Sequence, residues 1–143
     1  MKVAFTTQDS VHINAHFGWA SRIDVYDVDA QGYGFLETLE FKGNLQEDGN
    51  EDKLVPKLQA LHDCTIIYVS AIGGSAAARL IQKSVTPIKA ESESDQIEDV
   101  LRRLVQTLKG NPPPWLRKAL LKTQSKAASF EDSFETIEEE IAV

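Results

Sequence analysis

The sequence has little cysteine and no long apolar run. Cys64 is its single cysteine among 143 residues, so the chain can form neither an intramolecular disulfide nor a metal-cluster cage made of its own cysteines alone. No apolar stretch approaches the roughly 20 residues that a membrane-spanning helix needs, and the N-terminus shows no signal-peptide pattern. We therefore expect a protein of the reducing cytoplasm that does not enter a membrane.

The negative charge is concentrated at the C-terminal end of the chain. The formal net charge is −7, with 22 acidic and 15 basic residues. Six of the acidic residues lie between Phe130 and Val143, where there is no lysine or arginine. The rest of the chain is nearly neutral, which gives no broad support for binding nucleic acid.

Five segments have the composition of β-strands, namely residues 2–7, 22–28, 33–41, 65–69 and 85–89. The first and fourth are apolar on both faces, as central strands are. The second and third flank a turn and predict a hairpin, in which we expect Tyr33, Phe35, Leu39 and Phe41 to share one face.

Helices are expected between and after the later strands. Asp52 can cap a helix with Leu54, Val55, Leu58 and Leu61 on one face, and Pro56 falls in its first turn. A second helix, residues 76–83, follows Gly73-Gly74-Ser75. Ser94 can cap a third, whose apolar residues recur at helical spacing until Gly110 ends it.

The order of these elements predicts a mixed α/β sheet flanked by helices, because strands that alternate with helices pair in parallel through right-handed crossovers. We expect residues 1–110 to form this α/β domain. Residues 111–126 are interpreted as a proline linker with a short basic helix, and residues 127–143 as an acidic, disordered tail.

Two loops of the predicted sheet carry the residues most suited to binding a ligand. His12 and His16 follow the first strand, and Gly73-Gly74 follows the strand at 65–69. Ligands in open α/β sheets bind beyond the carboxyl ends of the strands. If these two strands are neighbours, an imidazole that can bind iron would lie beside a helix N-terminus that favours an anion. The same residues also fit a solvated histidine and an ordinary glycine turn, so the pattern leaves both interpretations open.

Cys64 is a candidate soft metal ligand, but it precedes its strand and therefore lies at the amino end of the sheet. A strand of that length, at about 3.3 Å per residue, would separate it from the other end by roughly 17–20 Å. A lone cysteine is more commonly a small buried hydrophobe. Phe17 and Trp19 flank Gly18, and we favour core anchors over ligand contacts for both.

The sequence does not indicate an enzyme. It shows no P-loop, no Ser–His–Asp arrangement and no H-E-x-x-H motif, and the two central strands lack the carboxylates of a two-metal nuclease. Trp115-Leu116-Arg117-Lys118, after three prolines, predicts either a docking element or a helix packed on its own domain. A protein-interaction or regulatory module acting through this C-terminal segment without binding a cluster is therefore the alternative function.

Several segments resemble the NifX/NafY-type family of nitrogenase accessory proteins, over roughly residues 1–122. They are Met1-Lys2-Val3-Ala4-Phe5, His16-Phe17-Gly18-Trp19-Ala20, Tyr26-Asp27-Val28, Asp52-Lys53-Leu54, Leu61-His62-Asp63-Cys64, Ala71-Ile72-Gly73-Gly74-Ser75-Ala76-Ala77, Pro87-Ile88-Lys89 and Pro113-Pro114-Trp115-Leu116-Arg117-Lys118. The last motif is the most diagnostic and points to the NifX branch.

The resemblance implies a ribonuclease H-like fold with a mixed five-stranded sheet. It also implies transient binding of iron–sulfur precursors of the iron–molybdenum cofactor, and exchange with the NifE–NifN scaffold complex and other cofactor-assembly proteins. The family's histidine maps onto His16 and its cysteine position onto Cys64. The expected cofactor-binding residues are His16, Phe17, Gly18, Gly73, Gly74 and Ser75, and the candidate metal ligands are His16, His12 and Cys64.

Overall fold

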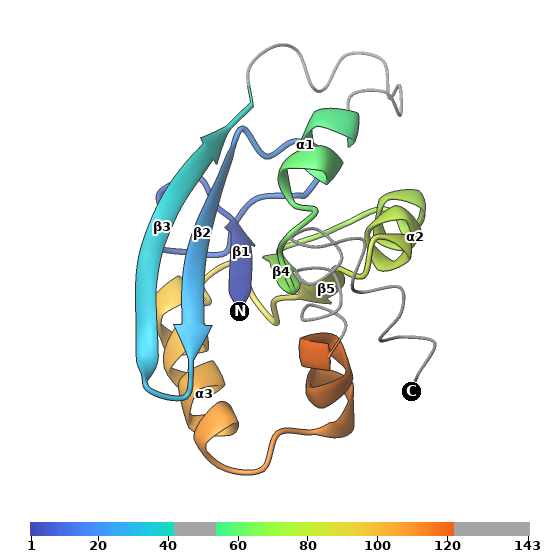
Figure 1. Cartoon of the computed structure of the whole chain (residues 1–143). Coiled ribbons are helices and arrows are strands. Elements are labelled where there is room, and N and C mark those ends of the chain that lie inside the picture. The colour runs from blue at the N-terminus through green and yellow to red at the C-terminus, as the bar shows by residue number, and fades with distance from the viewer. Residues whose placement is uncertain (42–53, 122–143) are drawn as a thin grey trace, which may run out of the picture.

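The computed structural model describes residues 1–41 and 54–121. Its sheet has five strands in the order β3-β2-β1-β4-β5 (Figure 1). They are β1 (Lys2–Thr6), β2 (Arg22–Asp29), β3 (Gly32–Glu40), β4 (Ile66–Val69) and β5 (Thr86–Lys89). β1 pairs antiparallel with β2 and parallel with β4, so the sheet is mixed as predicted.

Helices cover both faces of the sheet, because the central strands are apolar on both sides. α1 (Val55–Ala60) and α2 (Gly74–Gln82) share one buried cluster with Ala4 and Ile67. α3 (Ile97–Lys109) shares the other with Val3 and Phe5 (Figure 1). This three-layer arrangement confirms the predicted ribonuclease H-like α/β fold.

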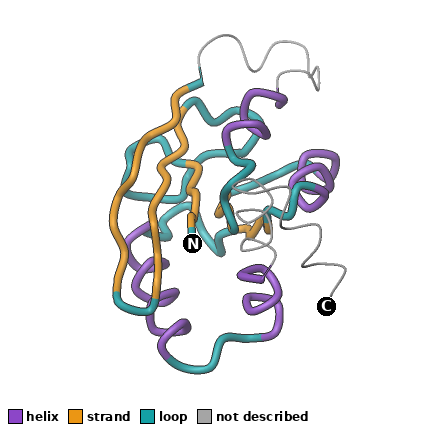
Figure 2. Tube along the Cα trace, viewed as in Figure 1, coloured by secondary structure: helices purple, strands orange, loops and turns teal. Residues whose placement is uncertain are grey.

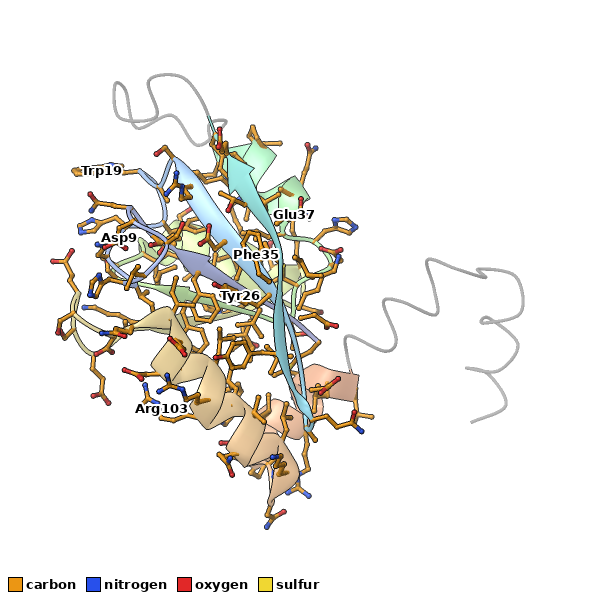
Figure 3. The ribbon with its side chains drawn as sticks, turned by 90° about the vertical axis from the view of Figure 1, so that its left-hand side faces the viewer. Asp9, Trp19, Tyr26, Phe35, Glu37 and Arg103 are labelled. Carbon is orange, nitrogen blue, oxygen red and sulfur yellow. The ribbon has the colours of Figure 1, made fainter. Side chains whose placement is uncertain are left out.

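The predicted common face of the β3 side chains is wrong. The pairing of β2 with β3 shifts between Val25 and Tyr26 and leaves out Leu36, which is a β-bulge. An extra residue reverses the alternation of side chains beyond it. Phe35 therefore packs edge-on against Tyr26, 5.5 Å between ring centroids (Figure 3), whereas Leu39 packs in the cluster on the opposite face of the sheet.

The helix starts differ in two respects from those expected. α2 begins at Gly74, two residues earlier than predicted. Gln96, not Ser94, is the N-cap of α3, and the Ser94 hydroxyl hydrogen-bonds to the Ser92 hydroxyl instead. Pro56 lies in the first turn of α1 as predicted. The expected cap Asp52 lies outside the described residues.

Residues 114–121 form a further helix, which follows α3 after a short loop (Figure 2) and packs on the domain. Leu116 is fully buried in the cluster beneath α3, whereas Trp115 and Leu121 are 44% and 66% exposed. This helix is thus anchored by Leu116 and keeps an apolar outer surface. No helix in the described part of the chain is long and apolar enough to cross a membrane.

Candidate functional site

The loop that carries His16 is bound to the segment that follows β4. His16 forms an isolated parallel bridge with Ala71, in which the Phe17 N–H donates to the Ala71 carbonyl at 2.9 Å. The Ser70 N–H donates to the Ala15 carbonyl at 3.2 Å. Two loops that are far apart in the sequence therefore meet beyond the carboxyl ends of β1 and β4, as the sequence predicted for neighbouring strands.

His16 is exposed and stacks on Trp19. The two rings are nearly parallel, at 19°, with 5.4 Å between their centroids. Trp19 is 60% exposed and projects from the surface (Figure 3), so its prediction as a core anchor is wrong. Phe17, in contrast, is fully buried, which leaves only its backbone close to this surface. His16 and Trp19 thus face solvent, while the buried Phe17 side chain anchors the loop.

The N-terminus of α2 lies beside the same loop, because Gly73, its N-cap, is only two residues after Ala71. No side chain caps this helix, and its first turn contains no acidic residue. A Cβ atom at Gly18, Gly73 or Gly74 would meet no atom within 4 Å, and none of the three has a positive φ. The fold does not require glycine at these positions, which suits close approach of a ligand to the backbone.

His12 lies in the same loop but is bound to a different neighbour. It forms an isolated bridge with Gln96 at the start of α3, and its Nδ1 lies 2.8 Å from Asp9 Oδ2. Hydrogen bonds from the His12 backbone N–H and ring hold the pKa of Asp9 well below its usual range. A histidine that donates through Nδ1 to a carboxylate presents Nε2 outward, which is the usual arrangement for a metal-ligating histidine.

Cys64 lies at the other end of the sheet. It precedes β4 and is 1% exposed, packed among the residues beneath α1 and α2. Ala71, the partner of His16, follows the opposite end of the same strand. The structure therefore brings His16 together with Gly73, Gly74 and Ser75, and does not bring Cys64 to them.

Lys57 is the residue that the sequence analysis missed. It is 0% exposed, and its Nζ donates to the carbonyls of Phe17 at 2.9 Å and Gly18 at 3.0 Å. The signal was present in the sequence, since Lys57 stands three residues after Leu54 and four before Leu61, inside the apolar stripe of α1. A lysine in such a stripe either extends its ammonium group to solvent or finds a buried partner.

We call the surface formed by His16, Trp19 and the N-terminus of α2 the His16 rim. Within the described residues no group of three or more histidine, cysteine, aspartate or glutamate side chains could hold a metal ion. The His16 rim can therefore supply few protein ligands, backbone N–H groups for an anion and a flat aromatic surface. Such a site suits weak, reversible binding rather than permanent coordination.

The sequence pattern of the dinitrogenase iron-molybdenum cofactor family matches residues 1–107. The chain is 48% identical to Protein NifX of Herbaspirillum seropedicae over 132 residues, which is 92% of this chain and 90% of that protein. The chain therefore belongs to the dinitrogenase iron-molybdenum cofactor family, and within it to the NifX proteins.

Two further similarities support the fold and the family. The chain is 32% identical over 87 residues to the FeMo cofactor biosynthesis protein NifB of Bradyrhizobium diazoefficiens, covering 60% of this chain and 17% of that protein. The crystal structure of PH0822 superposes with a TM-score of 0.57 at 18% identity, covering 80% of this chain and 97% of that one. The second likeness shows the fold alone.

Proposed function

We propose that this protein binds iron–sulfur precursors of the nitrogenase iron–molybdenum cofactor at the His16 rim and passes them on during cofactor biosynthesis. Membership of the NifX proteins supports a role in that biosynthesis. The observation that carries the proposal is the bridge between His16 and Ala71, which joins an exposed imidazole to an uncapped helix N-terminus.

The chemistry of the rim matches an anionic iron–sulfur cargo. A neutral imidazole nitrogen binds iron, and the N–H groups of the first turn of a helix favour negative charge. Because the protein supplies few ligands, the cluster can dissociate without many metal–ligand bonds having to break. The protein accordingly acts as a carrier that returns its cargo chemically unchanged, and not as an enzyme.

An anaerobic binding titration tests this function. Purified apo-protein is mixed with isolated cofactor precursor, and iron that co-elutes with the protein in gel filtration is measured. His16→Ala is expected to weaken uptake roughly 10–100-fold, by analogy with the loss of groups at metal sites. His62→Ala, an exposed histidine at the amino end of the sheet, is the matched control and should bind as the wild type does. Failure of wild-type uptake, or equal uptake by His16→Ala, would show the proposal to be wrong.

We further propose that the receiving partner is the NifE–NifN scaffold complex, and that helix 114–121 contributes to docking. The supporting observation is Trp115, which is 44% exposed beside the buried Leu116. Co-purification with the scaffold should weaken in Trp115→Ala and survive in His16→Ala. The opposite pattern, with Trp115→Ala still co-purifying and His16→Ala lost, would assign docking to the His16 rim instead.

A further inference from the structure

A buried ammonium group lies directly beneath the His16 rim. Lys57 is 0% exposed, although it sits in a six-residue helix whose other buried residue is Leu58. Burial of a charged group is strongly unfavourable unless polar groups compensate it. Lys57 therefore lowers stability unless the groups around its ammonium compensate for the lost solvation.

The compensation comes from backbone carbonyls and aromatic rings. Besides its bonds to the Phe17 and Gly18 carbonyls, the Nζ lies 5.8 Å from the Phe17 ring centroid and 5.7 Å from that of Phe41. Among the residues that the structure describes, no carboxylate forms an ion pair with Lys57. The positive charge is consequently held by dipoles, and part of its field extends to the surface above.

The same contacts fix the backbone of the loop. The Phe17 N–H is bound to Ala71 and the Phe17 carbonyl to Lys57, so both sides of this residue are held by different parts of the chain. The Gly18 carbonyl is held by the same ammonium group, and the Trp19 N–H donates to the His16 carbonyl at 3.2 Å. The residues on either side of the buried Phe17 are His16, which stacks on Trp19, and Gly18.

We propose that Lys57 is a positioning residue of the His16 rim: its buried ammonium group fixes the loop that presents His16 and Trp19, and adds positive charge beneath an anionic cargo. The inference rests on the proposed function, because it names a residue that prepares that site without touching the cluster. An apolar side chain of similar length at position 57 would leave two carbonyls without their donor.

The test compares Lys57→Met with Leu61→Ala. Methionine fills a similar volume and removes both the charge and the donors. Leu61 is also fully buried at the end of the same helix, and its truncation lowers stability while leaving the hydrogen bonds of Lys57 to the loop in place. In the anaerobic titration, Lys57→Met is expected to bind precursor roughly tenfold or more weakly, as when a group that orients a ligand is removed. Leu61→Ala is expected to bind as the wild type does.

A second measurement needs no cluster. In a Trp115→Phe background Trp19 is the only tryptophan, since the chain has two. The emission of Trp19 reports its stack on His16, so the change produced by His16→Ala defines the signal of an unstacked ring. Lys57→Met should reproduce that change and Leu61→Ala should not. If Lys57→Met does not fold, Lys57→Gln, which is neutral, replaces it in both experiments.

The outcomes separate the two proposals. Unchanged Trp19 emission and unchanged cluster affinity in the Lys57 variant would overturn the inference. It would also be overturned if Leu61→Ala lost as much cluster affinity and Trp19 signal as its lower stability predicts from the Lys57 variant. If the wild-type protein takes up no cluster, the proposed function fails, and the Trp19 emission alone decides whether Lys57 positions the loop.

Discussion

The two ends of the sheet are built in opposite ways, and each contains a lysine that shows the difference. At the amino end, Lys2 donates to the Asp63 carboxylate, and the N-terminal ammonium group donates to the Val28 carbonyl at 2.8 Å. At the carboxyl end, Lys57 is buried against carbonyls. Lys2 thus forms an exposed ion pair, whereas Lys57 is a buried charge beneath the exposed His16.

The difference supports the proposal that the ligand binds at the carboxyl end of the sheet. At the amino end, Lys2 and the N-terminal ammonium group each have a carboxylate partner, and Cys64 there is buried. The His16 rim instead has an exposed aromatic stack, a helix start without a side-chain cap, and a cation without a described carboxylate partner. Such groups gain most from an external anion or metal.

The strongest test of this comparison is a pair of substitutions, one at each end of the sheet. We expect His16→Ala to change folding free energy by less than about 0.5 kcal/mol, because the side chain is exposed, while uptake of precursor falls roughly 10–100-fold. Cys64→Ala should show the reverse, with a loss of about 1 kcal/mol in stability and full uptake. Denaturant unfolding and the anaerobic titration measure the two quantities on each variant.

Loss of uptake in Cys64→Ala at unchanged stability would assign a ligand role to the cysteine. That result would require the cargo, or the protein, to bridge the length of β4. Cys64→Ser is a useful companion, because a buried hydroxyl lowers stability without restoring a thiolate.

The pH dependence of stability should have opposite signs at the two lysines. Burial lowers the pKa of Lys57 from 10.5 to about 8 in the folded protein. Between these values the unfolded chain binds more protons, so the free energy of unfolding should rise from pH 8 towards pH 10, by about 1–3 kcal/mol. Below about pH 8 both states are protonated, and the unfavourable burial is fully present.

Lys57→Met supplies the reference for this measurement. The difference between wild type and variant cancels other groups that titrate in alkali, such as Tyr68, whose burial raises its pKa to about 12. Lys2 works in the other direction, because its hydrogen bond to Asp63 raises its pKa and so contributes stability that is lost only above pH 10.5. If the free energy of unfolding changes with pH in the same way in the wild type and in Lys57→Met, the ammonium group is not desolvated.

Periodicity predicted the elements well where one pattern covered a whole segment. The two strands that are apolar on both faces were correctly placed at the centre, and the apolar stripe from Ile97 defined α3. It failed at β3, because a bulge at Leu36 changes the alternation without changing the composition. The cap of α3 was also missed, since Ser94 satisfies its hydroxyl within the turn before the helix.

Only the location of the site could be predicted from the sequence. Chain order and the rule for strand ends brought His16 and Gly73 to one rim, and this placement is confirmed. The partners that hold the rim together come from elsewhere in the sequence or from local turns, as Lys57 and the Asp9–His12 pair do. Composition does not tell whether a histidine bonds to a carboxylate three residues away. The ligand roles of His16, His12 and Cys64 therefore stay predictions.

A smaller effect is expected from adding methyl groups at the helix N-terminus of the rim. Gly73→Ala and Gly74→Ala both have space for their Cβ atoms and ordinary backbone angles. Gly74→Ala, in the first turn of α2, should leave stability unchanged or raise it by up to about 1 kcal/mol. Gly73→Ala should lower stability by up to about 1 kcal/mol, because alanine is a poorer N-cap than glycine. If the cargo approaches this backbone, the double variant should bind precursor several-fold more weakly than the wild type. Full affinity in a folded double variant would show that these glycines form an ordinary turn.

The smallest effect is expected at the amino end, where Lys2 and Asp63 form an ion pair with side chains 38% and 43% exposed. Solvent screens such a pair, so a double-mutant cycle of Lys2→Ala and Asp63→Ala should give a coupling of only about 0.2–1 kcal/mol. Neither variant should change uptake of precursor, because Lys2 begins β1 and Asp63 precedes β4, whereas the His16 rim lies at the opposite ends of these strands. A coupling lost in 1 M salt would confirm an exposed pair, whereas reduced uptake would mean that the amino end contributes to the cargo site after all.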